Sequence, residues 1–134
     1  MTLPEPRRVP RLVIEAVHLD QIREHGGILG IRDENALESA LARARQRWTY
    51  EPESDLARLA ADYAFGICSS HPFRDGNKRI SFLAAVIFLG LNGFDFVAPE
   101  DEVVERMLAL ASGNLDEEAV AEWLRSRTEP RPGV

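Results

Sequence analysis

The chain has 134 residues, of which 45% are hydrophobic and 28% are charged. These values suit one folded domain and exclude a disordered or low-complexity protein. The 22 acidic residues exceed the 16 basic residues and give a net charge of −6, so the chain lacks a general attraction to phosphate backbones and we expect no DNA or RNA partner.

Residues 1–10 combine prolines and arginines without periodicity and are predicted to form a flexible N-terminal arm. Apolar residues then recur at helical spacing over residues 12–24, and Gly26-Gly27 supplies the stop that helices favour. A second helix is expected to begin after Asp33, a suitable N-cap, and to bury an apolar face that extends to Ala44.

A third helix is predicted from an N-cap at Ser54 or Asp55 to about Ile67, because its apolar residues follow the i, i+3, i+4, i+7 pattern. A fourth helix is expected over residues 77–91, where apolar residues occupy nearly every side, so it belongs at the centre of a bundle. Its apolar stretch is well short of the roughly 20 residues that cross a bilayer. The single cysteine, Cys68, is expected in the core, and without a secretory signal the chain is expected in the cytoplasm, with no membrane partner.

The last part of the chain is predicted to contain two more helices, over residues 99–111 and 116–124. A short run before them, residues 94–97, is the one segment with strand character. The predicted fold class is therefore all-α, a compact six-helix bundle with a central buried helix. We assign the helical domain to residues 11–128 and a C-terminal tail to residues 129–134.

Chemistry-bearing residues are concentrated between the third and fourth helices, in the stretch His71–Arg79. A helix N-terminus leaves backbone N–H groups unpaired and has a partial positive charge, so it is a ready site for an anion such as phosphate. Lys78 and Arg79 occupy the first turn, where cations oppose the helix dipole unless an anion compensates. Gly76 would let the backbone approach such an anion closely, so the placement of Lys78 and Arg79 suggests a bound polyphosphate.

Two titratable residues precede this turn. Asp75 offers a hard oxygen ligand for Mg²⁺, and His71 can accept a proton from an attacking hydroxyl near neutral pH. Phe73 is expected to anchor the loop in the core. Taken singly, each residue has an ordinary explanation, since lone histidines are more often structural and Asp75 could be an N-cap alone. Together they predict an active site for phosphate transfer.

The stretch His71–Arg79 resembles the signature of the Fic/Doc superfamily, in which a histidine, a phenylalanine, an acidic residue, a glycine or alanine, an asparagine and an arginine occupy these places. The similarity extends through His25–Asp33 to the helix with Trp123, where the chain resembles the Doc (death-on-curing) branch. The resemblance implies a compact helical bundle. It also implies that His71 is the catalytic base and that Asp75 is the metal-binding acid. Gly76, Asn77, Lys78 and Arg79 would form the phosphate-binding turn.

Lys78 distinguishes this sequence from typical Fic enzymes, which have glycine there and transfer the AMP group of ATP to target hydroxyls. A lysine at this position is similar to the Doc branch, whose members bind the nucleotide in the orientation opposite to that of the AMP-transferring Fic enzymes. The resemblance thus implies transfer of the γ-phosphoryl group of ATP to a threonine of elongation factor Tu, which arrests translation. AMP transfer stays open as the alternative, because Pro72 matches the Fic form of the signature and Ser69-Ser70 stand where some Doc members have a basic residue.

Many Fic proteins silence themselves with a helix bearing a Ser/Thr-x-x-x-Glu-Gly/Asn motif, which this sequence lacks. Together with the Doc resemblance, its absence implies restraint by a small antitoxin whose tail folds on binding. The segment Arg43–Tyr50, with Trp48, is a candidate docking surface, although a buried tryptophan is equally expected. A catalytically inactive protein-binding module is a second alternative, and intact His71, Asp75 and Asn77 argue against it.

Overall fold

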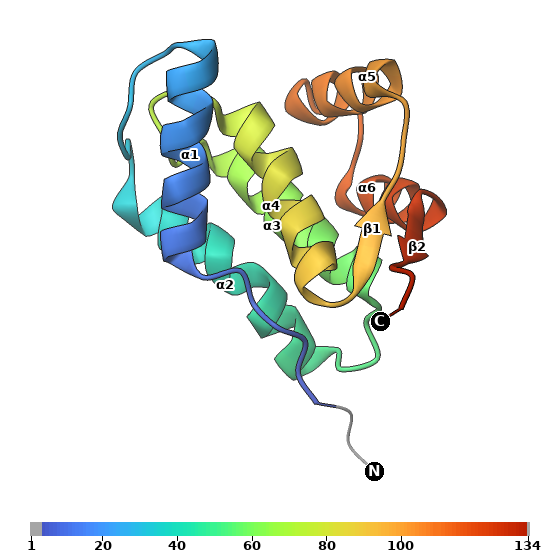
Figure 1. Ribbon diagram of the computed structural model, residues 1–134. Helices are drawn as coiled ribbons and strands as arrows, with labels where there is room; N and C mark the ends of the chain where they lie inside the picture. Colours follow the sequence, from blue (N-terminus) through green and yellow to red (C-terminus); the bar gives the residue numbers. More distant parts are fainter. Residues whose placement is uncertain (1–3, 134) are drawn as a thin grey trace.

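The computed structural model describes residues 4–133. Six α-helices and two short strands follow along the chain (Figure 1): α1 (Arg11–His25), α2 (Glu34–Tyr50), α3 (Leu56–Ser70), α4 (Asn77–Leu91), β1 (Phe94–Phe96), α5 (Glu100–Ala111), α6 (Glu117–Ser126) and β2 (Thr128–Pro130). The predicted all-α fold is confirmed, and every expected helix is present. Within the described residues, no helix combines the length and apolar character needed to cross a membrane.

Aspartate side chains begin three of the helices. Asp33 Oδ1 accepts the backbone N–H of Ala36 at 3.0 Å at the start of α2. Asp55 and Asp116 cap α3 and α6 in the same way, at 2.9 and 2.8 Å. Because a lost N-cap costs about 1 kcal/mol, these residues fix where the helices begin and so where the connecting loops end.

The centre of the bundle is shared by α4, as expected, and α3, which packs against α2, α4 and α6. The close approach of α2 and α3 depends on Gly66, where a Cβ would lie 2.7 Å from Arg43 Cδ and 3.2 Å from Ala40 Cα. Cys68 is buried in the core, and that burial raises the pKa of its thiol. The absence of a side chain at Gly66 therefore lets α2 approach α3 closely.

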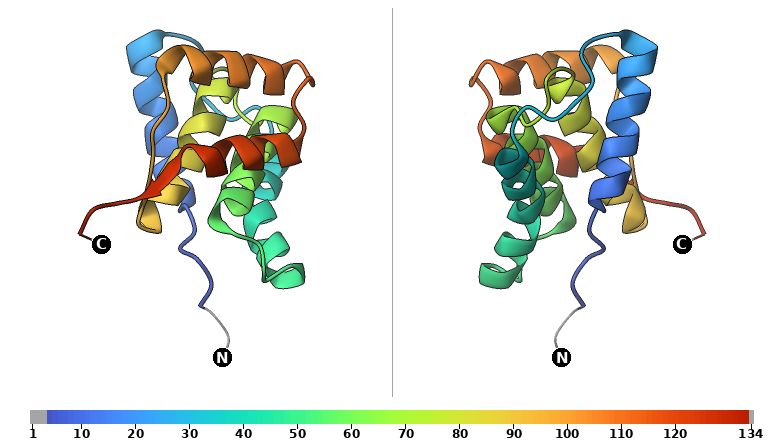
Figure 2. Two further views of the ribbon diagram at one scale, coloured as in Figure 1. Left: turned by 90° about the vertical axis from the view of Figure 1, so that its right-hand side faces the viewer. Right: turned by 90° about the vertical axis from the view of Figure 1, so that its left-hand side faces the viewer.

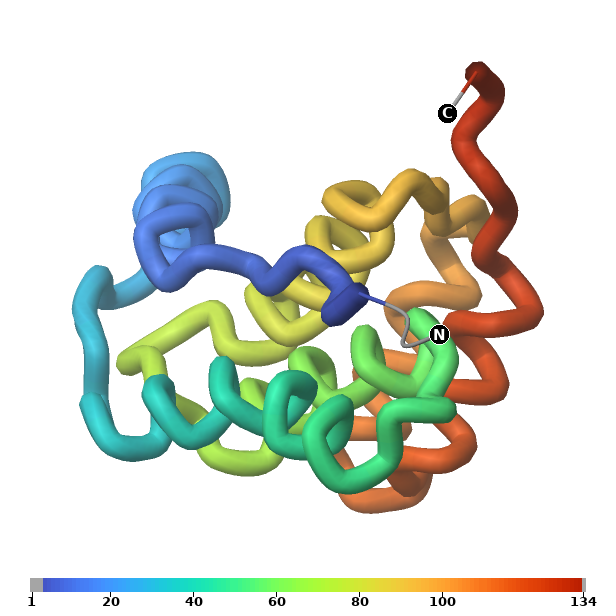
Figure 3. Tube along the Cα trace, turned by 90° about the horizontal axis from the view of Figure 1, so that it is seen from below, coloured from blue at the N-terminus to red at the C-terminus, as the bar shows by residue number. Residues whose placement is uncertain are grey.

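Residues 4–10 have defined contacts with the end of α4 (Figure 3). Asn92 satisfies both backbone groups of Arg7: its Oδ1 accepts the N–H at 2.8 Å and its Nδ2 donates to the carbonyl at 3.0 Å. Val9 is buried and donates its N–H to the Tyr63 hydroxyl at 3.2 Å. The arm predicted from the sequence is thus tied to the helical domain along its described length.

The chain after α4 forms a small antiparallel ribbon, in which β1 pairs with β2. The strand character expected over residues 94–97 is seen in β1, whereas β2 was not expected. Its pairing continues to Arg131, whose N–H donates to Gly93 O at 2.9 Å, so the assigned domain end at residue 128 falls within this ribbon. Phe96 of β1 packs edge-on against Trp123 at 5.2 Å and joins the ribbon to the core.

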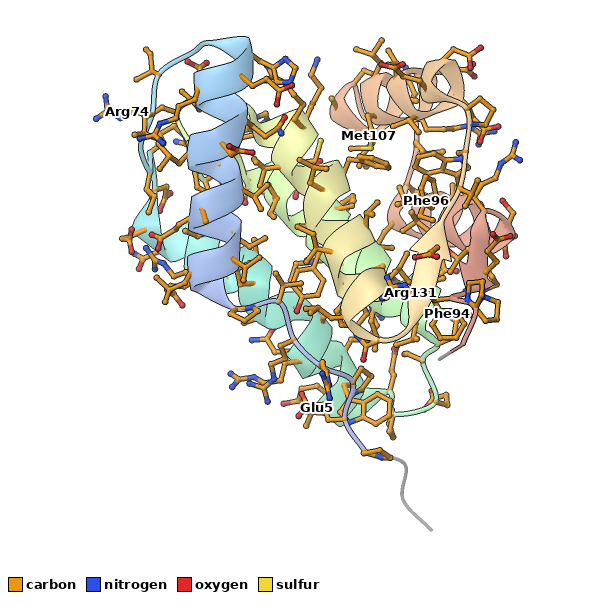
Figure 4. All side chains as sticks on the ribbon, viewed as in Figure 1. Glu5, Arg74, Phe94, Phe96, Met107 and Arg131 are labelled. Atoms are coloured by element: carbon orange, nitrogen blue, oxygen red, sulfur yellow. The ribbon has the colours of Figure 1, made fainter. Side chains whose placement is uncertain are left out.

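The connections α1–α2 and α3–α4 lie side by side at one end of the bundle, at the upper left of Figure 1, and both chain ends lie toward the other. In Figure 4, Arg74 projects at the first end, and Glu5, Phe94 and Arg131 lie toward the second. Figure 2 shows α5 crossing the bundle near the beginning of α4. The signature residues are therefore gathered where two loops and the start of α4 meet.

Candidate active site

The signature loop, residues 71–76, joins α3 to α4 and begins at His71. His71 has a left-handed backbone, with φ 50° and ψ 58°, and is the one non-glycine residue with positive φ within residues 4–133. This conformation costs an L-residue about 1–2 kcal/mol, and such strain is concentrated at functional sites. The His71 side chain is exposed. The predicted base thus stands at the end of a rigid helix, accessible from solvent.

Arg32 stabilises the end of α3 from the α1–α2 loop, residues 26–33. Its Nε donates to His71 O at 2.7 Å and its Nη2 donates to Ser70 O at 2.8 Å. A guanidinium here satisfies carbonyls that the helix leaves unpaired and is favoured by the negative end of the helix dipole. Arg32 therefore helps to hold the left-handed turn at His71.

The backbones of the α1–α2 loop and the signature loop also pair with each other. Arg32 N donates to Pro72 O at 2.7 Å, and Arg74 N donates to Gly30 O at 3.0 Å. Phe73 is buried in the core, as predicted, between these two hydrogen bonds. The α1–α2 loop, residues 26–33 of the segment that carries the family resemblance, thus forms the second edge of the site.

Asp75 is held by the same loop. Its Oδ2 accepts the backbone N–H of Ile28 at 2.6 Å. Gly27 makes this approach possible, because its φ is +114° and a Cβ there would lie 3.1 Å from Asp75 Cβ. The carboxylate is half-buried, so one oxygen is fixed by the protein while the group stays within reach of a ligand.

The single carboxylate of Asp75 fits a Mg²⁺ ion that is bound together with phosphate. Within residues 4–133 there is no cluster of three or more histidine, cysteine, aspartate or glutamate side chains that could hold a metal. Mg²⁺ commonly uses one or two carboxylates and completes its shell with phosphate oxygens and water. Asp75 Oδ1 has no hydrogen-bond partner among the described residues, so this single carboxylate can serve a cation brought by a nucleotide.

The Asn77 carboxamide binds the loop itself. Its Oδ1 accepts the N–H of Phe73 at 3.0 Å and its Nδ2 donates to the carbonyl of Phe73 at 2.9 Å. Both ends of the side chain are thereby engaged. The second Nδ2 hydrogen and the backbone N–H at the start of α4 remain for a ligand, so the phosphate-binding role of Asn77 stays a prediction.

The turn at the start of α4 leaves several groups for an anion. Gly76 is the N-cap with φ 81°, a backbone that only glycine adopts readily, and it makes no side-chain cap. Lys78 and Arg79 are exposed, and neither forms an ion pair among the described residues. Unpaired helix N–H groups and two unpaired cations therefore lie in the same turn, and its binding of phosphate stays a prediction.

A groove of about 270 Å³ extends from these cations between α4, α1 and α5. Most of its lining is apolar; it comprises Gln21, Lys78, Arg79, Phe82, Leu83, Val103, Val104, Met107 and Leu108. Met107 lies on the inner side of α5 in Figure 4. The groove can take a group that is anionic at one end and apolar along its length.

Two residues that shape the site were not singled out from the sequence. Arg32 acts on backbone carbonyls, which no motif reveals. His18 is a buried histidine of α1 that contacts the Asp75 carbonyl at 2.9 Å. A signal was present for His18, because Ile14, His18 and Ile22 are spaced by four and the histidine interrupts an apolar stripe.

Residues 9–89, more than half of the chain, match the model of a family described as the Fic/DOC family. The chain belongs to the Fic/Doc family. The matched range includes α1 to α3, all but the last two residues of α4, and both loops of the site, so the Fic/Doc elements are those that position the signature residues.

The chain is 32% identical over 110 residues to "Protein kinase doc" of Escherichia phage P1, an alignment that covers 82% of this chain and 86% of the phage protein. The resemblance to the Doc branch is thereby confirmed. A similar solved structure is the N-terminal Fic domain of a putative cell filamentation protein from Bartonella quintana with bound ADP, at 17% identity and a TM-score of 0.47. That alignment covers 81% of this chain and 54% of the solved chain, so the chain spans about half of its length.

Proposed function

We propose that the protein is a Doc-like toxin that transfers the γ-phosphoryl group of ATP to a protein hydroxyl. The observation that carries the proposal is the convergence of the α4 N-terminus, Lys78 and Arg79 beside an exposed His71. The "Protein kinase doc" name of the phage relative supports a kinase among the transfer reactions open to this family. The expected target is a threonine of elongation factor Tu, whose modification would arrest translation in the cytoplasm.

The reaction follows from the roles of these residues. His71 accepts the proton of the target hydroxyl, whose oxygen attacks the γ-phosphorus of ATP. The bond from the γ-phosphorus to the bridging oxygen breaks, and ADP leaves with the electron pair. The unpaired N–H groups of the turn, with Lys78 and Arg79, bind the phosphate oxygens and stabilise their developing charge. Asp75 would hold Mg²⁺, which would neutralise charge on the β- and γ-phosphates.

Lys78 supports phosphoryl transfer over AMP transfer. A long cationic side chain beside the anion site would occupy space needed to place the α-phosphate there, and would add charge beside a γ-phosphoryl group. The structure leaves this side chain exposed and without an acidic partner among the described residues. We expect Lys78→Gly to slow γ-phosphoryl transfer or to change which group is transferred.

The test is to incubate the protein with elongation factor Tu, Mg²⁺ and ATP labelled at either the α- or the γ-phosphate. The γ-label should become protein-bound and the α-label should not. The matched controls are His71→Ala, which removes the base, and His25→Ala, which removes an exposed histidine of α1 outside the site.

Each outcome of the labelling experiment has a distinct meaning. Bound α-label that is lost in His71→Ala would replace the kinase by an AMP transferase. In a parallel incubation with a cell lysate, bound γ-label on other proteins but not on elongation factor Tu would overturn the target alone. No bound label in either incubation would favour the inactive protein-binding module.

We further propose that an antitoxin restrains the toxin by placing an amphipathic tail in the groove between α1, α4 and α5. Apolar residues of such a tail would cover Val104 and Leu108, which are 53% and 52% exposed. Acidic residues would pair with Lys78 and Arg79 at the end of the groove. Such a tail would match the groove, because its apolar face would cover the apolar lining and its negative charge would pair with the two cations.

The alternative docking surface is Arg43–Tyr50. Trp48 is half-buried against the core, while Tyr50 is 83% exposed. With the antitoxin as the binding partner, Leu108→Glu should weaken the complex at least tenfold, and Tyr50→Glu should leave it unchanged. The reverse result would move the docking site to Arg43–Tyr50.

A further inference from the structure

His18 is a buried polar residue that the proposed reaction does not use. It lies in the middle of α1, and its side chain is 2% exposed. Its ring stacks on Phe73 with centroids 4.1 Å apart and an interplanar angle of 24°. A buried imidazole needs a hydrogen-bond partner to offset its desolvation, and the partner here is part of the signature loop.

That partner is the backbone carbonyl of Asp75, 2.9 Å from His18 Nε2. A carbonyl oxygen can only accept a hydrogen bond, so Nε2 must carry the hydrogen. His18 therefore donates to the loop from beneath. Gly76 lies close to the same side of the ring, since a Cβ at Gly76 would be 3.8 Å from His18 Cδ2 and 4.0 Å from Nε2.

The hydrogen bond determines which way the Asp75–Gly76 peptide faces. The described chain has no cis peptide bond, and in a trans peptide the C=O and the N–H point in opposite directions. Because the Asp75 carbonyl points inward to His18, the Gly76 N–H must point away from the core. This N–H belongs to the turn that precedes α4.

We propose that His18 is a positioning residue for nucleotide binding, because its Nε2–H fixes the Asp75–Gly76 peptide with the Gly76 N–H directed at the phosphates. This role rests on the proposed function, since it assumes that the turn binds a nucleotide. Without the donor, the peptide can rotate and turn the Asp75 carbonyl oxygen toward the phosphates. An N–H donor would then be exchanged for an oxygen that repels the anion.

Two substitutions separate the hydrogen bond from the packing. His18→Phe keeps an aromatic ring against Phe73 and removes the donor. His18→Gln loses the ring but keeps an N–H donor at the same number of bonds from Cα. His25→Phe is the control, because it makes the same change at an exposed histidine of α1.

The measurements are the dissociation constant of ATP with Mg²⁺, the kcat and KM of phosphoryl transfer, and the melting temperature. We expect His18→Phe to weaken ATP binding and to raise KM by about tenfold or more, as for a lost hydrogen bond to a charged group, with a smaller change in kcat. His18→Gln should restore most of the affinity. The melting temperatures should have the reverse order, because phenylalanine packs better than glutamine in this place.

A purely structural role for His18 would give the two variants the same order in affinity and in stability, and this result would overturn the inference. A His18→Phe variant that binds ATP with wild-type affinity would also overturn the inference. A wild-type chain that binds no ATP would overturn the proposed function and this role with it. A readout without nucleotide is the ¹H–¹⁵N spectrum, where the His18 Nε2–H should exchange slowly with solvent; rapid exchange would contradict the hydrogen bond itself.

Discussion

The start of α4 and the arginine cluster between α2, α3 and α6 contain similar side chains and use them in opposite ways. In the cluster, Asp62 is 1% exposed and accepts from Arg47 Nε at 2.7 Å. Glu117 receives Arg43 at 2.7 Å and Arg58 at 3.2 Å. Each cation of the cluster thus has a carboxylate within the chain.

The start of α4 has no such compensation, because Lys78 and Arg79 are exposed and unpaired among the described residues. In the cluster, Arg43 Nε and Arg58 Nη1 lack an aligned hydrogen bond within the described chain, so charge pairing stabilises the cluster as much as hydrogen bonding does. Dense charge alone therefore does not indicate a ligand site. Charge that the protein leaves unmatched beside unpaired backbone donors does so.

The largest expected effect is at His71. His71→Ala should lower the rate of phosphoryl transfer about 10²–10⁴-fold, as expected for loss of a general base. It should leave the free energy of unfolding nearly unchanged, because the side chain is exposed. His71→Gly should be equally inactive yet more stable by about 0.5–1 kcal/mol, since glycine adopts the left-handed backbone without strain. Urea denaturation and rate measurements check both; a large loss of stability in His71→Ala would make His71 a structural residue.

Arg47→Met should show the opposite behaviour. It leaves the buried Asp62 carboxylate without its nearest cation and should cost about 3–5 kcal/mol of unfolding free energy. The folded fraction should still transfer phosphate at the wild-type rate. Arg45→Met is the control on the same helix, because Arg45 is exposed, and it should change stability by less than about 0.5 kcal/mol. A kcat that falls in Arg47→Met would break the separation between the two regions.

Gly27→Ala tests the contact between the α1–α2 loop and Asp75. The backbone at φ +114° and the 3.1 Å approach to Asp75 Cβ should together cost about 2–3 kcal/mol and displace the carboxylate. Gly26→Ala separates the two causes, because Gly26 has φ +82° but no atom within 4 Å of its Cβ position. It should cost about 1 kcal/mol and leave Mg²⁺-dependent activity intact. Equal activity in both variants would argue against Asp75 as the metal ligand.

The smallest expected effect is a pH dependence that originates in the arginine cluster. Burial and, to a smaller extent, the neighbouring Glu117 raise the pKa of Asp62 to about 6, against the lowering effect of Arg47. Burial alone would also raise the pKa of Glu117. Its contacts with Asp62, Arg43 and Arg58 outweigh that effect and lower the pKa to about 2.

These shifts give the cluster its maximum contribution to stability near pH 4–5. As pH falls from 7 through 6, the native state binds a proton at Asp62 that the unfolded state, with a pKa of 3.8, does not yet bind, so stability rises. As pH falls from 4.5 toward 2, the unfolded state protonates Glu117 before the native state does, and stability falls. Each change should be on the order of 1 kcal/mol, because the groups titrate as a pair.

Melting curves across this range check the prediction. Asp62→Asn should remove the rise between pH 7 and pH 5, and Glu117→Gln should remove the fall between pH 4.5 and pH 2. Unchanged profiles in both variants would exclude the cluster as the origin.

The sequence predicted the helices well because their apolar periodicity and aspartate caps are local signals. The signature stretch was found for a similar reason, since His71, Asp75 and the predicted phosphate-binding turn lie within one segment. The strand β2 was missed because Thr128–Pro130 has no apolar alternation and its partner, β1, is distant in the sequence. Pairing of this kind depends on the fold around it.

The supporting residues of the site were harder to predict. Arg32 and His18 act on the backbone carbonyls of His71 and Asp75, and a carbonyl has the same chemistry at every position of the chain. The contacts of the Asn77 carboxamide with the backbone groups of Phe73 were not expected either, while its part in phosphate binding stays a prediction. Which carbonyl or N–H is in reach depends on how two loops pack.

The α1–α2 loop precedes the signature loop in the chain, and this order has a consequence for synthesis. A nascent chain emerges from its N-terminus, so His18, Gly27 and Arg32 are available before His71 and Asp75 are made. The reactive loop can be shaped against surfaces that already exist. The arginine cluster is complete only after Glu117 has been synthesised. All residues of the candidate active site are therefore made before the residue that completes the charge balance of the cluster.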